Sequence, residues 1–103
     1  VLTLACKPAP SAYDARAGLS KLGVKSVSCS TASSGRVTCK GTYGRQAIKW
    51  GGTPNVETGG LELVSSVGRL RSVSMFKQGT DFNGRICSRW VPSTSYTCHS
   101  YGE

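Results

Sequence analysis

The cysteine content constrains this chain more than any other feature: five cysteines occur in 103 residues, and none are spaced as Cys-x-x-Cys. Only one histidine accompanies them, which disfavours a closed zinc site with its four Cys or His ligands. Disulfides are the better interpretation, and each would stabilise the domain by about 2–4 kcal/mol. The alternative is a set of buried free thiols in a cytosolic protein. We expect no metal and no cofactor.

The length fits one domain over residues 1–103. Only 17% of the residues are charged, and Gly and Ser are abundant, which is typical of a compact, loop-rich extracellular fold. The sequence contains no long apolar run, so it predicts no transmembrane segment. The first five residues, VLTLA, are too short for a signal-peptide core. We therefore expect a mature, secreted protein whose targeting segment was removed or lies outside this sequence.

The segment PSAYDARAGLSKLG, residues 10–23, predicts a helix. Ser11 can cap its start, and Asp14 follows three residues later, as in a capping box. Apolar residues at spacings of three and four form one stripe, and Gly23 can end the helix in the left-handed conformation.

Alternating apolar and polar residues predict strands over 24–30, 35–41 and 44–51. A polar turn near residues 33–35 joins the first two strands into a hairpin. Cys29 and Cys39 then lie close together, and their pairing is the preferred disulfide. Strands are also expected over 84–91 and 95–101, after a turn over 78–84. Cys87 and Cys98 can close this terminal hairpin, or Cys6 can take either of them, which leaves one cysteine over.

The segment between these two groups of strands is ambiguous. Leu63, Val67 and Leu70 form a helical stripe, whereas three glycines oppose a stable helix. We predict a helix from about Thr58 to Leu70, and residues 71–77 either extend it or begin a strand. The expected fold class is α+β: a small two-layer sandwich stapled by disulfides, with two helices on one face of an antiparallel sheet of about four strands.

The formal net charge is +8, and such a balance attracts anionic partners. Alternation along two adjacent strands places four basic side chains on the solvent side of the sheet. We predict that they form the binding surface: Arg36, Lys40, Arg45 and Lys49. The expected partner is an anionic surface or a protein, with weak, salt-sensitive nucleic-acid binding through charge alone.

Catalytic chemistry finds little support. A ribonuclease needs an acid and a base, and His99 stands alone near one chain end, with Glu62 as a conceivable partner. His99 would also serve as the base for a cysteine nucleophile. A surface strand position for His99 is the simpler interpretation. We expect no enzymatic activity, and a small basic ribonuclease is the alternative.

Aromatic residues offer two further alternatives. Trp50 and Trp90 stand beside basic residues, but strand alternation turns each tryptophan away from them and towards the core. A carbohydrate-binding module could instead use tyrosines for sugar stacking, and the candidates are Tyr13, Tyr43, Tyr96 and Tyr101.

The run AYDARAGLSKL, residues 12–22, followed by the Cys29–Cys39 strands, resembles the opening of small secreted fungal proteins related to killer toxins, including a chain of a corn-smut toxin. The segments AIKWGG (47–52) and FNGRICSRWV (82–91) are similar in outline. The resemblance implies a compact α/β sandwich and a secreted toxin or plant-colonisation effector without catalytic residues. This chain has fewer cysteines than those toxins, and an odd number. A disulfide-linked dimer through the odd cysteine is an alternative to a monomer.

Overall fold

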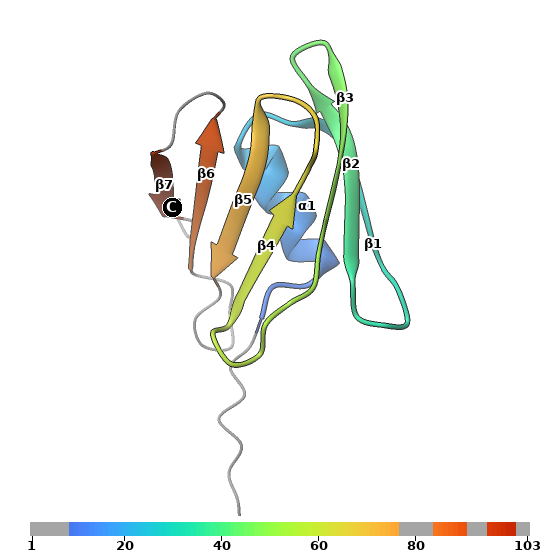
Figure 1. Ribbon diagram of the computed structural model, residues 1–103, viewed down its shortest axis with the longest axis vertical. Coiled ribbons are helices and arrows are strands. Elements are labelled where there is room, and N and C mark those ends of the chain that lie inside the picture. The colour runs from blue at the N-terminus through green and yellow to red at the C-terminus, as the bar shows by residue number, and fades with distance from the viewer. Residues whose placement is uncertain (1–8, 77–83, 91–94, 101–103) are drawn as a thin grey trace, which may run out of the picture.

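The computed structural model describes residues 9–76, 84–90 and 95–100 (Figure 1). Within these residues the chain forms one helix and a seven-stranded antiparallel sheet whose strands follow one another in chain order. The helix lies behind the sheet in Figure 1. The elements are α1 (Ala12–Lys21), β1 (Lys25–Thr31), β2 (Val37–Tyr43), β3 (Gln46–Gly52), β4 (Gly60–Val64), β5 (Leu70–Phe76), β6 (Arg85–Trp90) and β7 (Tyr96–Ser100).

The predicted first helix is confirmed, together with its capping box. The Ser11 backbone N–H donates to the Asp14 carboxylate at 2.9 Å, and the Asp14 N–H donates to the Ser11 hydroxyl at 3.4 Å. Ala15 and Leu19 from the apolar stripe are fully buried. They join the core residues of the sheet, so α1 covers one face, here called the inner face.

The three strands predicted after the helix are also confirmed. Cys29 and Cys39 are register partners and form a disulfide, as predicted. The two terminal strands form as well, and Cys87 pairs with Cys98. Cys6 and nearly all of the predicted 78–84 turn lie outside the described residues.

The predicted second helix is wrong. Residues 60–64 and 70–76 form the antiparallel strands β4 and β5. Leu63 and Leu70 are both fully buried, but Val67 between them is 47% exposed in the connecting turn. Gly68 in that turn has φ +91°, which a helix cannot accommodate. The helical spacing therefore arose from two inward-facing strand residues and one turn residue.

This correction overturns the predicted fold class. The described residues do not form a two-layer α+β sandwich with two helices on a four-stranded sheet; they form mostly one seven-stranded sheet with a single short helix. Within these residues, α1 supplies the second layer. The stretch predicted as the second helix, residues 58–70, instead supplies β4 and the turn after it. Of the two alternatives for residues 71–77, the strand is confirmed as β5.

The sheet is weakly joined in the middle. Strands β3 and β4 share a single register pair, Gly51 with Val64, whereas β2 and β3 share seven. On the inner face Trp50 crosses this junction, and its indole Nε1–H donates to the Leu70 carbonyl at 2.9 Å. Trp50 is 1% exposed, which confirms its predicted place in the core. The β3–β4 junction is thus bridged on the inner face and open on the opposite face.

Candidate functional site on the outer face

The candidate site lies on the face of the sheet opposite α1, here called the outer face. Lys40 of β2 and Lys49 of β3 are register partners there, and both are exposed. The residue beside Lys40 on β1 is Ser28, which carries no charge. The structure gives neither ammonium group a hydrogen bond or an ion pair with another described residue. Two like charges therefore face each other without compensation.

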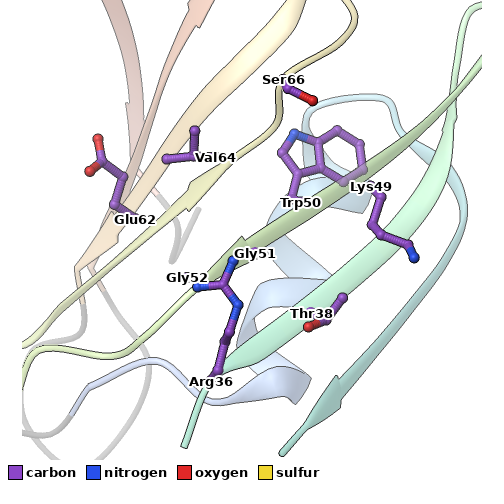
Figure 2. A pocket seen from close by; sticks show the side chains of 9 residues that line it. All are labelled: Arg36, Thr38, Lys49, Trp50, Gly51, Gly52, Glu62, Val64 and Ser66. Carbon is purple, nitrogen blue, oxygen red and sulfur yellow. The ribbon is translucent and has the colours of Figure 1, made fainter.

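Arg36 extends this basic surface at the start of β2. Its backbone carbonyl closes the β1–β2 turn by accepting from the Ala32 N–H at 2.9 Å. Its side chain lies against Gly51, with Cζ 3.0 Å from the place that a β-carbon on Gly51 would occupy (Figure 2). A side chain at position 51 would displace the guanidinium. The guanidinium has no hydrogen-bond or ion-pair partner among the described residues.

A hollow of about 690 Å³ opens where β3 and β4 diverge. One wall comes from the hairpin of β2 and β3, and the other from β4 and the turn after it (Figure 2). The lining residues are Arg36, Thr38, Lys49, Trp50, Gly51, Gly52, Glu62, Val64 and Ser66.

The charges around the hollow are unevenly divided. Arg36 and Lys49 stand on the hairpin wall, and Glu62 stands on the opposite wall. One oxygen of the Glu62 carboxylate accepts from the Ser72 hydroxyl at 3.2 Å. The sequence contains no acidic residue between Asp14 and Glu57, so the whole β1–β3 region is free of carboxylates.

The four predicted binding residues occupy related but unequal positions. Lys40 and Lys49 share the outer face, and Arg36 lies beside them over Gly51. Arg45 lies in the two-residue turn between β2 and β3 and does not line this hollow. The structure therefore brings three of the four together.

Val64 and Ser66 were not predicted as site residues because residues 58–70 were assigned to a helix, and Glu62 was considered only as a partner of His99. Gly51 was not predicted either, since its role depends on Arg36 reaching it from the start of the neighbouring strand. A Gly-Gly pair at the end of a strand is the signal that indicates such a close approach.

The conceivable ribonuclease pair does not form. His99 is the register partner of Ile86, which pairs in turn with Met75 on the inner face. Glu62 pairs with Ser74 on the outer face. The two side chains therefore leave the sheet on opposite faces. His99 is exposed on an edge strand, as the simpler interpretation predicted.

The tyrosines proposed for sugar stacking do not gather on one surface. Tyr13 is 75% exposed on α1, and Tyr96 is 49% exposed on β7. Tyr43 is half-buried at the end of β2 and packs against the core. Tyr101 and the side chain of Trp90 fall outside the described part of the chain.

Within residues 9–76, 84–90 and 95–100, no three His, Cys, Asp or Glu side chains gather as a metal site requires. The helix that the structure describes is not long and apolar enough to cross a membrane. Comparison of the chain with protein-family models, curated protein sequences and solved structures found no match.

Proposed function

We propose that this protein acts by binding a polyanionic partner through the basic outer face of β2 and β3, without catalysing a reaction. One observation carries the proposal: Lys40 and Lys49 face each other directly, with no counter-charge supplied by the described residues. Like charges directly opposite each other on a sheet are destabilising. A bound polyanion would turn that cost into a favourable interaction.

Secretion is part of the same proposal. Two disulfides are formed, and such bonds persist mainly in oxidising, extracellular environments. A net charge of +8 would concentrate the protein on anionic surfaces outside the cell.

The binding proposal is tested by salt elution from immobilised heparin, a generic polyanion. A Lys40→Gln/Lys49→Gln variant should elute at clearly lower salt than the wild type, and its log–log salt slope should fall by about 2. The matched control is Arg16→Gln/Lys21→Gln, which removes the same charge from α1 on the other face. Equal elution of the two variants would show that net charge, not this face, governs binding.

On the resemblance to killer-toxin-like proteins, we propose that the partner belongs to a competitor or a host and that the protein is a toxin or an effector. Oxidised protein applied to yeasts and filamentous fungi should inhibit growth of a sensitive strain, and the Lys40→Gln/Lys49→Gln variant should inhibit less. Inhibition that is equal for both proteins would separate toxicity from the basic face. If no strain were inhibited, the toxin hypothesis would be excluded and the effector hypothesis would stand.

A further inference from the structure

The hollow between β3 and β4 brings together specific hydrogen-bond donors and charges, which a surface that only attracts anions does not require. Its hairpin wall offers two cationic side chains, Arg36 and Lys49, and one hydroxyl, Thr38. With Glu62 on the other wall, the lining residues carry a local net charge of +1. A singly charged group would balance this charge.

Arg36 is exposed, and its guanidinium lies over Gly51, where the absence of a side chain leaves room for it. It has no hydrogen-bond or ion-pair partner among the described residues. A guanidinium presents a planar fork of N–H donors that matches two oxygens of an oxyanion.

The remaining donors favour an anion with a third oxygen. Thr38 and Lys49 line the same wall as Arg36. The Lys49 ammonium points away from Arg36 in Figure 2, so an oxyanion engaged by Arg36 accepts from Lys49 only after this exposed side chain turns towards it. A carboxylate has two oxygens, and a phosphodiester has two free oxygens, so the fork of Arg36 would use both of them. A terminal sulfate ester has three free oxygens and one negative charge. A phosphate monoester has three as well but carries about 1.5–2 charges at pH 7.

The opposite wall indicates the kind of molecule to which such a sulfate ester would be attached. It presents the Glu62 carboxylate, the Ser66 hydroxyl and the Val64 side chain, which is 53% exposed. Acceptors next to a small apolar surface suit the hydroxyl groups and the carbon face of a sugar. The volume of about 690 Å³ lies within the ordinary range of ligand sites. A single-stranded nucleic acid would need exposed aromatic side chains for stacking, and Trp50 in this lining is 1% exposed.

We propose that this hollow binds a sulfate ester of a sugar, so that the polyanionic partner is a sulfated glycan. Arg36, held on Gly51, supplies the fork, and Lys49 and Thr38 contact the third oxygen. This inference rests on the proposed function and specifies its partner.

The test uses oligosaccharides of equal charge. Calorimetry compares a tetrasaccharide with four sulfate esters against tetragalacturonate, whose four charges are carboxylates. The wild type should bind the sulfated probe about tenfold more tightly, the effect of one well-placed charge-assisted contact. Arg36→Lys keeps the charge but loses the fork. Gly51→Ala keeps every charge and displaces the guanidinium. Each should reduce the tenfold preference to about threefold or less, with carboxylate binding nearly unchanged.

Arg45→Lys is the matched control, because it makes the same exchange in the turn outside the hollow and should keep the preference. Retained disulfides and an unchanged near-ultraviolet circular dichroism spectrum establish that each variant is folded. If Gly51→Ala does not fold, Arg36→Lys decides the outcome alone.

Equal binding of the two probes by the wild type, or an unchanged preference in Arg36→Lys, would overturn the sulfate site but leave the polyanion proposal standing. Failure of the wild type to bind heparin would overturn both. Two further arms address other anions. Tighter binding of a five-nucleotide single strand with four phosphodiesters would identify a nucleic acid instead. Stronger competition by glucose 6-phosphate than by glucose 6-sulfate would identify a phosphate monoester.

Discussion

The two disulfides allow a controlled test of how burial contributes to the stability of this fold. Cys29–Cys39 and Cys87–Cys98 have sequence separations of 10 and 11. In the chain-entropy model, closing a loop of this length stabilises the folded state by about 2.8 kcal/mol. The two bonds should therefore be worth nearly the same through their effect on the unfolded chain. Any difference between their measured contributions to stability therefore reflects the surroundings of each disulfide in the folded protein.

Each disulfide joins an edge strand to its neighbour, but the two differ in burial. Cys39 is fully buried in the inner core, and the half-buried Cys29 packs against that core. In the second disulfide Cys87 is 7% exposed and lies outside the core cluster, and Cys98 is exposed. Replacing the more deeply buried pair with alanine also leaves a small cavity, at a further cost of about 1–2 kcal/mol.

We therefore expect Cys29→Ala/Cys39→Ala to lower the free energy of unfolding by about 4–5 kcal/mol, and Cys87→Ala/Cys98→Ala by about 3 kcal/mol. The measurement is urea unfolding followed by tryptophan fluorescence. Both variants are made in a Cys6→Ser background, so that each retains a single pair and no further thiol. Equal losses, or a larger loss for the terminal pair, would refute the assignment of the first disulfide to the core.

Three further changes test other parts of the structure by the same unfolding measurement. Trp50→Phe removes the indole donor to the Leu70 carbonyl and should cost about 1–3 kcal/mol, because that acceptor is left unpaired; a loss below this range would mean that solvent reaches the carbonyl. Ser11→Ala removes the capping hydroxyl of α1 and should cost about 1 kcal/mol, whereas no loss would mean that the Asp14 carboxylate caps the helix alone. Gly52→Ala drives a β-carbon into the Glu62 backbone on β4, where no flexible side chain can give way, so it should destabilise the protein more than Gly51→Ala, and the reverse order would contradict the close approach of the two strands.

The parts of the fold that were predictable from sequence are those determined locally. Ser11 and Asp14, three residues apart, mark the start of α1, and Gly23 with its positive φ follows directly after its C-cap. The first hairpin is similar, because Cys29 and Cys39 lie close in sequence and alternation assigns both to the inner face.

The second helix was mispredicted because periodicity records spacing and not burial. Leu63 and Leu70 are inward residues of two different strands, and their separation matches a helical repeat only because the turn between them has a particular length. Val67 completes the stripe in sequence but is half-exposed in the structure. The positive φ of Gly68 carries the decisive information, and a glycine in a sequence does not reveal its φ.

The candidate site was likewise predictable only where it is determined by local sequence. The shared face of Lys40 and Lys49 follows from alternation along one hairpin, and it was predicted. The resting place of Arg36 on Gly51 depends on a contact across 15 residues, and the opposite wall depends on β4, which was not recognised as a strand. A hollow made by two segments requires both segments to be identified first.

The position of this hollow follows from how the sheet is joined. Because β3 and β4 share a single register pair, their outer side chains diverge, while Trp50 closes the gap from the inner side through Leu70. The basic hairpin and the carboxylate of Glu62 therefore face each other across an opening. Extending the antiparallel register of the Gly51–Val64 pair would place Ser66 opposite Lys49 and Thr53 opposite Glu62, so this register does not set the carboxylate against Lys49. The opening therefore leaves the cations of the hairpin available to an external anion, at the cost of hydrogen bonds in the middle of the sheet.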